Sequence, residues 1–232
     1  MSDKRESHIR LGKYLKDIVF AGNDGIITTF AVVAGVVGAE LSSVVVLIVG
    51  LANLIADGFS MASGNYLGTK SEKEFYAKEE AREKDEVRDT PEKEREEIRK
   101  ILVEKGYQGA DLENIVSLIS SNEKLWLDFM MHEELKLFAP NTDSPIKHAF
   151  ATFLAFVTAG AIPLIPYLLP ITSNSFLLAS IFSGTALFTI GALRRFFSDR
   201  SWITSGLEML IIGGFAATIA YFIGFLLKSA VL

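Results

Sequence analysis

Stretches of apolar residues alternate with polar segments along the chain of 232 residues. A helix needs about 20 consecutive apolar residues to cross the hydrocarbon core of a bilayer. Five windows meet or approach that length: 18–39, 42–67, 148–171, 176–193 and 203–227. The pattern therefore predicts an all-α integral membrane protein with five transmembrane helices.

One long polar block, residues 70–147, separates the second window from the third. A helix is expected over 76–89, and because 70–76 contains no Gly or Pro, the second span should run directly into it. The block has few large apolar residues in its first half and cannot bury a large core alone. We expect an N-terminal arm with two spans at 1–69, a helical insert, and three spans at 148–232.

The insert should contain two more helices. One is expected over 91–105, with Thr90 as its N-cap. After a shorter segment at 111–120, apolar residues recur at helical spacing over 122–138, and Pro140 should end that helix. The pattern thus predicts an insert of three helices.

Basic residues are distributed unevenly among the segments between the spans. The first 17 residues contain Lys4, Arg5, Arg10, Lys13 and Lys16, whereas the turn at Glu40 has no base. The insert is rich in bases and the turn at 170–175 has none. The turn after the fourth span carries Arg194, Arg195 and Arg200. By the positive-inside rule, the N-terminus and the insert are cytoplasmic and the C-terminus is outside.

Composition excludes several classes of protein. A net charge of −5 and a pI near 5.3 argue against a nucleic-acid partner. The lack of cysteine excludes disulfides and thiolate metal sites. The sequence has no phosphate-binding loop, no H-E-x-x-H motif and no recognisable Ser-His-Asp arrangement, so we expect neither an ATP-driven pump nor an enzyme.

Acidic residues gather on the first two helices of the insert. Glu79, Glu83 and Glu86 share one helix face, and Glu94 with Glu97 repeats the three-residue spacing on the next helix. Carboxylates spaced in this way can converge on one cation. Lysines and arginines interleave with these acids, so a solvated pair of charged helices is the alternative interpretation.

The third helix adds two methionines and an acid, Met130, Met131 and Glu134. Thioether and carboxylate ligands together suit a borderline transition metal better than Ca²⁺ or Mg²⁺. Methionine is also common core filler, and Met130 would then pack with Trp126. We expect His132 at the surface or beside the ligands rather than among them.

Charges inside the first two spans are nearly confined to Asp24, Glu40 and Asp57. Acids at membrane depth are costly and usually functional, so Asp24 and Met61 could offer a carboxylate and a thioether to an ion in a pore. Alternatively, Asp24 is a helix-cap or interfacial acid. Asp57 lies deeper and favours the functional interpretation.

Three other polar residues have structural interpretations. Glu208, at the start of the fifth span, is expected to pair with an arginine of the preceding turn. His8 and His148 are isolated in the sequence.

Four segments carry a more specific pattern: GNDGIITTFAVVAGVVGA in the first span, GLANLIADGFSMASGNYLGTKSEKEFY in the second, WLDFMMHEEL in the insert and GAIPLIPYLL in the third. In this order they resemble the vacuolar iron transporter family over essentially the whole chain. The resemblance implies a homodimer whose cytoplasmic insert gathers Fe²⁺ and passes it to a path between the subunits, in exchange for protons.

The resemblance also assigns residues. The implied metal ligands of the insert are Glu83, Glu86, Glu94, Glu97, Met130, Met131 and Glu134. In the membrane it implies translocation ligands at Asp24 and Met61. It does not place Asp57, which we treat as a candidate for proton coupling, or Glu79 and His132, which lie beside the matched positions.

We therefore expect proton-coupled antiport of Fe²⁺, with Mn²⁺ as a second candidate, out of the cytoplasm across a lipid bilayer. Zn²⁺ and Co²⁺ are further candidates for binding to the insert. Short termini favour a prokaryotic plasma membrane over a vacuolar one. The main alternative is a membrane-anchored metal sensor or buffer without flux. A di-iron enzyme should show Glu-x-x-His pairs, and the sequence has none.

Overall fold

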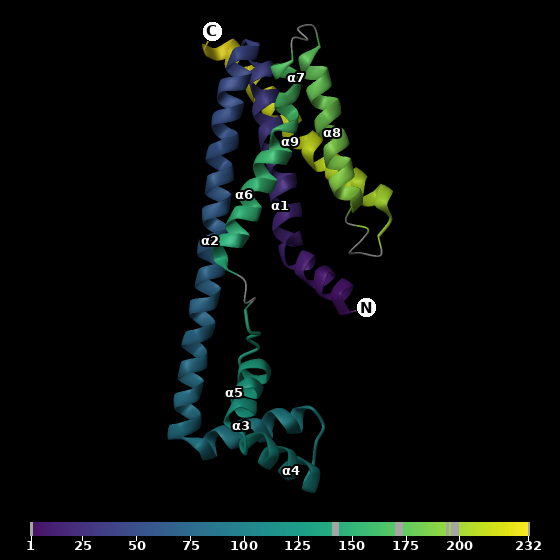
Figure 1. The fold of residues 1–232 in the computed structure, drawn as a ribbon. Helices are drawn as coiled ribbons and strands as arrows, with labels where there is room; N and C mark the ends of the chain where they lie inside the picture. The colour runs from purple at the N-terminus through teal and green to yellow at the C-terminus, as the bar shows by residue number, and fades with distance from the viewer. Residues whose placement is uncertain (1, 141–143, 170–173, 194, 196–199, 232) are drawn as a thin grey trace. The chain divides into compact units, whose positions relative to one another are not determined.

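A computed structural model describes residues 2–140, 144–169, 174–193, 195 and 200–231 (Figure 1). Within these ranges every regular element is a helix, which confirms the all-α prediction. Among the described residues, five helical segments are long and apolar enough to cross a membrane, as the apolar windows predicted.

The helices divide between two compact units, residues 1–67 with 143–232, and residues 68–142. The first unit contains α1 (Ser2–Gly38), the start of α2 (Ser43–Asp89), α6 (Pro145–Gly160), η2 (Ile162–Leu164), α7 (Ile165–Leu168), α8 (Ser175–Leu193) and α9 (Trp202–Val231). The second contains the end of α2, α3 (Pro91–Glu104), α4 (Gly109–Ser120), α5 (Glu123–Phe129) and the π-helix η1 (Met130–Glu134).

Two of the predicted spans have informative boundaries. The second runs without a break into the insert as one 47-residue helix, α2, as the lack of Gly and Pro predicted. The third, expected as one helix over 148–171, is broken after Gly160 into α6, η2 and α7. Pro163 and Pro166 explain the break, because proline donates no backbone hydrogen bond and clashes with the preceding turn. Most of the turn expected at 170–175 lies outside the described residues.

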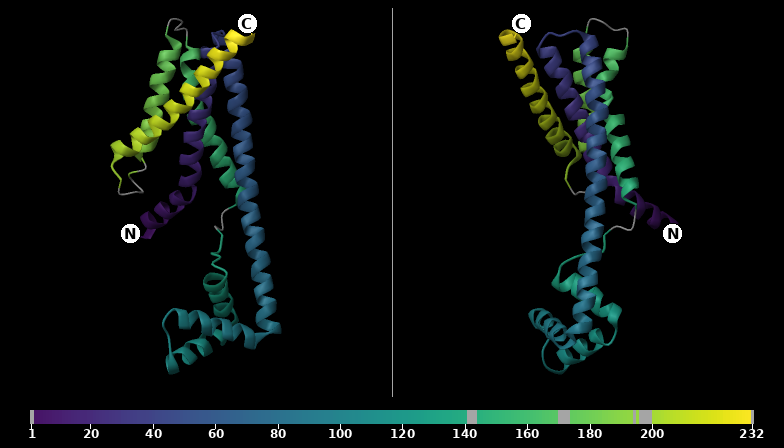
Figure 2. Two further views of the ribbon diagram at one scale, coloured as in Figure 1. Left: turned by 180° about the vertical axis from the view of Figure 1, so that it is seen from behind. Right: turned by 90° about the vertical axis from the view of Figure 1, so that its left-hand side faces the viewer.

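Helix α1 is the centre of the first unit and packs along α6 and α9 (Figure 2). Glycines make this close approach possible. A Cβ atom at Gly25 would overlap the carbonyl oxygen of Phe156 on α6, and one at Gly38 would overlap that of Tyr221 on α9. Small residues at helix crossings are typical of membrane bundles, where van der Waals packing replaces the hydrophobic effect.

The membrane part of α2 is much less covered. Val46 and Leu54 are buried against the core of the first unit. Its exposed large apolar residues include Val44, Ile48, Val49, Leu51, Ile55, Phe59 and Leu67. Such a surface needs lipid or another protein surface against it.

The second unit has its own small core. Its buried side chains are Val87, Ile98, Leu102, Leu112, Val116, Ile119, Trp126 and Met130. Residues 109–120, expected only as a shorter segment, form the complete helix α4, which packs on α3. The three-helix prediction for the insert was therefore one helix short, because α4 buries an apolar face against α3.

The helix expected over 122–138 was predicted too long. Asn122 caps α5 by accepting a hydrogen bond from the backbone N–H of Leu125 at 3.1 Å. The α-helix then gives way to η1, and Lys136 has a positive φ of 55°, so the helical path ends well before Pro140. Thr90 occupies the N-cap position of α3, but its hydroxyl donates to the Glu86 carbonyl instead of capping.

Candidate metal sites

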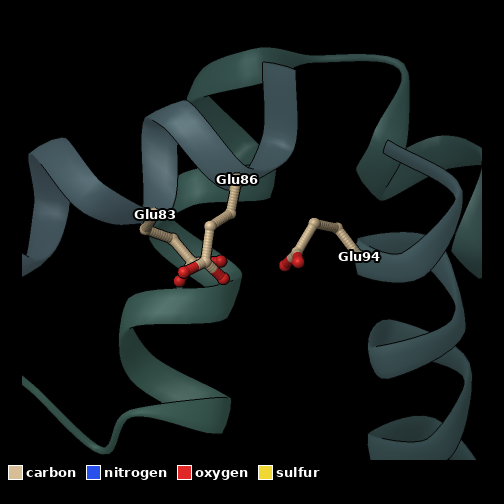
Figure 3. Close-up of side chains that lie close together, drawn as sticks. All are labelled: Glu83, Glu86 and Glu94. Atoms are coloured by element: carbon tan, nitrogen blue, oxygen red, sulfur yellow. The ribbon is translucent and has the colours of Figure 1, made fainter. Parts of the chain in front are cut away.

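The turn between α2 and α3 brings the acids of the insert together. Thr90 alone separates the end of α2 at Asp89 from the start of α3 at Pro91, so the last turns of α2 meet the first turns of α3. Glu83 and Glu86 lie one turn apart on α2, and their side chains point toward Glu94 on α3 (Figure 3). The sequence therefore positions the acids through one short turn and two amphipathic helices.

Five carboxylates form two overlapping groups. Oxygens of Glu83, Glu86 and Glu94 all lie within 4.8 Å of one another, and so do oxygens of Glu94, Glu97 and Glu134. Glu94 belongs to both groups. Hard divalent cations bind such sets of carboxylate oxygens.

Two of these acids are buried, which distinguishes them from a solvated charged surface. The side chains of Glu83 and Glu94 are 4% and 0% exposed. Glu83 Oε1 and Glu94 Oε2 have no hydrogen-bond partner. A buried carboxylate oxygen without a partner carries a large desolvation cost, and a bound cation would remove it.

The electrostatics of the groups agree with this geometry. Burial, with the nearby charges of Glu134 and Glu94, raises the pKa of Glu83 from 4.5 to about 8. Burial and the charge of Glu97 also raise the pKa of Glu94. Without a cation, Glu83 therefore holds a proton near neutral pH and donates a hydrogen bond to Glu94.

Part of the negative charge is neutralised by a lysine. Lys93 Nζ lies 3.3 Å from Glu97, 3.5 Å from Glu94 and 4.0 Å from Glu86. Local neutralisation, the alternative interpretation, therefore holds at the edge of the cluster. Because this lysine is exposed, its ammonium group can move away when a cation binds. It offers one positive charge against five carboxylates, so the buried acids remain undercompensated.

The methionines occupy the π-helix beside the acids. Met130 is fully buried in the hydrophobic cluster that contains Trp126, as the core interpretation expected. Met131 is also buried and lies outside that cluster. Glu133, between Met131 and Glu134, forms an ion pair of 2.8 Å with Lys105, at the end of α3. This contact ties η1 to the helix that carries Glu94 and Glu97.

Two neighbouring residues stay outside the acid groups. Glu79 pairs with Arg82 at 3.9 Å. His132 stacks on Phe138 with ring centroids 5.2 Å apart. Among the described residues, neither belongs to either acid group.

A second candidate site lies in the first unit, on α1 and α2. Asp24 and Asp57 are close enough for their charges to interact. The Asn53 side-chain amide donates to Asp57 at 2.8 Å, and Met61 follows Asp57 by one helical turn. A helix-cap role for Asp24 was wrong, because α1 continues unbroken on both sides of it. Asp57, which the family pattern did not place, thus joins Asp24.

Two other polar pairs lie outside these sites. Arg200 lies 3.7 Å from Glu208, which confirms the expected pairing with an arginine of the preceding turn. Of the other two candidate partners, Arg195 and Arg194, the second is outside the described residues. His148 is not isolated, because its Nδ1 lies 2.6 Å from Asp17 Oδ2. The two residues are 131 positions apart, so no local pattern could indicate this pair.

Comparison with known proteins finds relatives whose names agree with one another. A model described as the VIT family matches residues 15–225. The chain is 35% identical over 217 residues to "Vacuolar iron transporter 1" of Arabidopsis thaliana, covering 93% of this chain and 87% of that protein. It is 38% identical over 240 residues to "Vacuolar iron transporter" of Toxoplasma gondii, covering 99% and 80%. A protein of that name from Plasmodium falciparum is 33% identical over 238 residues, covering 98% and 87%.

Proposed function

The chain belongs to the VIT family, and on that premise we propose that it transports Fe²⁺ across a membrane in exchange for protons. It is a multi-pass membrane protein, and its relatives are named as iron transporters. The observation that carries the proposal is the pair of buried acids, Glu83 and Glu94, each with an oxygen that lacks a partner. An anchor or a solvated surface has no need of such groups.

The donor atoms support Fe²⁺, with Mn²⁺ as a second substrate, over Mg²⁺. Carboxylates surround the insert site, and the buried thioether of Met131, outside the hydrophobic cluster that holds Met130, lies on the π-helix that also carries Glu134. Mg²⁺ keeps its water ligands and rarely accepts sulfur, whereas borderline metals tolerate mixed ligation. The same donors suit Zn²⁺ and Co²⁺ as ions that bind the insert.

Protons and metal would compete for the same carboxylates. Because the pKa of Glu83 is about 8, a cation that binds there near neutral pH must displace a proton. In the membrane, Asp24 and Met61 would bind the ion during translocation. Asp57, close to Asp24, would contribute to proton coupling.

A homodimer is part of the proposal. The exposed apolar face of α2, which includes Ile48, Ile55 and Phe59, offers a surface for a second copy. The same helix carries Asp57 and Met61, so a dimer at this face would place the ion path near the contact between subunits. The loop charges support a cytoplasmic N-terminus and insert. A prokaryotic plasma membrane stays a prediction, and the relatives carry vacuolar names.

Uptake of Fe²⁺ into proteoliposomes under an imposed proton gradient tests the function. We expect gradient-dependent uptake by the wild type, loss of uptake in Asp24→Asn, and slower uptake in a double variant with Glu94→Ala and Glu97→Ala. The matched control changes Glu92 and Glu96, exposed acids of α3 that pair with arginines. Metal binding without flux in the wild type would instead establish the membrane-anchored sensor or buffer.

A further inference from the structure

A buried titratable pair lies between α6 and α1, apart from both candidate metal sites. His148 Nδ1 is 2.6 Å from Asp17 Oδ2, and the two side chains are 8% and 16% exposed. The Tyr14 ring packs against the imidazole, with centroids 4.7 Å apart and an interplanar angle of 41°. The aromatic ring and the helix packing shield the pair from solvent.

The second ring nitrogen of His148 makes this pair responsive to protons. Nε2 is buried and has no hydrogen-bond partner. When Nδ1–H donates to Asp17, Nε2 either carries a proton or has a lone pair that accepts no hydrogen bond. The protonated ring forms a neutral ion pair with the carboxylate, and the deprotonated ring leaves the single negative charge of Asp17. One proton therefore decides whether this buried site is neutral or negative.

Two titratable residues of α1 contact the imidazole, Tyr14 and Asp17. On α6 itself the preceding Lys147 is exposed. One turn further along α6, Thr152 accepts a 2.6 Å hydrogen bond from the uncharged amide of Asn65 on α2. Asp17 is thus the acid that contacts the ring directly.

The position of the pair connects it to the proposed ion path. Asp17 precedes Asp24 by seven residues on α1, two turns on the same helix face and about 10 Å along the axis. Asn65, which contacts α6, follows Met61 by one turn of α2. A cation bound at Asp24 would repel a proton on His148 across a poorly screened interior. Removal of that cation would favour reprotonation.

We propose that His148 and Asp17 form a proton-binding site of the transporter, which releases its proton when metal occupies Asp24 and regains it when the metal leaves. The inference rests on the proposed proton-coupled transport and adds a residue pair that carries the proton. One H⁺ leaves Nε2 for water on the cytoplasmic side when Fe²⁺ arrives at Asp24, and Nε2 takes up one H⁺ from water on the opposite side when the ion departs. This site therefore carries one proton for each Fe²⁺, and the other positive charge of the ion is not offset here.

Simultaneous recording of Fe²⁺ uptake and proton flux, with a pH-sensitive dye inside proteoliposomes, tests the site. In His148→Gln and in Asp17→Asn we expect Fe²⁺ to move down its own gradient while the metal-driven proton flux per Fe²⁺ falls below that of the wild type. His8→Gln, which changes a histidine of the N-terminal arm, is the control and should keep both fluxes. Unaltered proton flux per Fe²⁺ in both variants overturns the inference.

The outcome for the wild type separates this inference from the function on which it rests. Wild-type protein that moves Fe²⁺ without protons overturns the antiport and, with it, the proton site. Wild-type protein that moves both, with variants that also move both, overturns the proton site alone. If Fe²⁺ and proton fluxes are coupled in the wild type and uncoupled in the variants, both the antiport and the proton site are supported.

A second measurement does not depend on folding of the His148 variants. The chain has three histidines, so ¹⁵N-histidine labelling resolves the ring of His148 by NMR in detergent. At the pH where half of the wild-type His148 ring is protonated, we expect a smaller protonated fraction in Asp24→Asn, because a negative charge two turns away is lost. Glu208→Gln, which removes a charge on α9, should leave the fraction unchanged. If the protonated fraction of the His148 ring changes with neither pH nor Asp24→Asn, the inference is overturned.

Discussion

The insert and the membrane spans both hold carboxylates away from water, but in different surroundings. In the insert, five glutamates gather around a small hydrophobic core, with one exposed lysine between them. In the spans, Asp24 and Asp57 lie on two long helices, and Asp57 accepts a hydrogen bond from Asn53. The insert thus concentrates negative charge, whereas the membrane site limits it to two acids and one nearby thioether. Under the proposed function, the insert would capture the ion and the membrane site would select it.

The methionines of the two regions give the largest contrast. Met130 fills the core of the insert, so Met130→Ala should lower the free energy of unfolding of the insert by about 2–5 kcal/mol. Met61 only borders the core of the first unit, and Met61→Ala should reduce the preference for Fe²⁺ over Mg²⁺ more than stability. Thermal unfolding and competitive uptake measure the two effects. An unchanged metal profile in Met61→Ala would count against a thioether ligand there.

The shared acid of the insert should matter more than its neighbours. Glu94→Gln removes a ligand from both acid groups, and we expect the metal affinity of the insert to fall at least about tenfold. Titration of the full-length protein with Co²⁺, followed by its visible absorption, gives the affinity. Glu92→Gln on the exposed face of α3 is the control. Equal losses in the two variants would show that net charge, not the buried site, controls binding.

Because the pKa of Glu83 is raised, the stability of the metal-free insert should depend on pH. The folded pKa of about 8 exceeds the ordinary 4.5, so its contribution to stability is present at low pH and is lost as pH rises toward 8. Metal-free protein should lose a few kcal/mol of insert stability, about 4 kcal/mol at most, between about pH 5 and 8. In a Trp202→Phe background, Trp126 fluorescence reports unfolding of the insert. Glu83→Gln should flatten this dependence, and a slope that survives the change would assign it to another group.

The smallest effect concerns the lysine at the edge of the acid cluster. Lys93 competes with a cation for Glu86, Glu94 and Glu97. Lys93→Met should raise metal affinity by a few-fold at most, since an exposed ion pair contributes roughly 0.2–1 kcal/mol. Isothermal titration of the full-length protein can detect this change, with Lys84→Met as the control because Lys84 pairs with Glu123 instead. Weaker binding in Lys93→Met would show that the lysine organises the site.

The sequence predicted what depends on neighbouring residues. Apolar length predicted the five spans, and the absence of Gly and Pro at 70–76 predicted the unbroken α2. The spacing of Glu83 and Glu86 placed both on one face of α2, where they meet Glu94. Such features follow from helical periodicity, which acts over a few turns.

Features that depend on tertiary contacts could not be predicted. The π-helix η1, in which Met130 and Met131 are buried, replaces regular α-helix, and the spacing of apolar residues does not show it. The contact of His148 with Asp17 joins residues far apart in the chain. The break near Pro163, in contrast, could have been predicted from the proline itself. The expectation of one helix followed the apolar length of the segment instead.

The membership of Glu94 in both acid groups has a consequence for how the insert fills with ions. Because one carboxylate serves two positions, the second ion must share a charge that the first already uses, and it meets the repulsion of that first ion. Two ions bound in this way would show negative cooperativity. The insert would retain one ion firmly and hold the next loosely, so the loosely held ion is the one available for onward transfer.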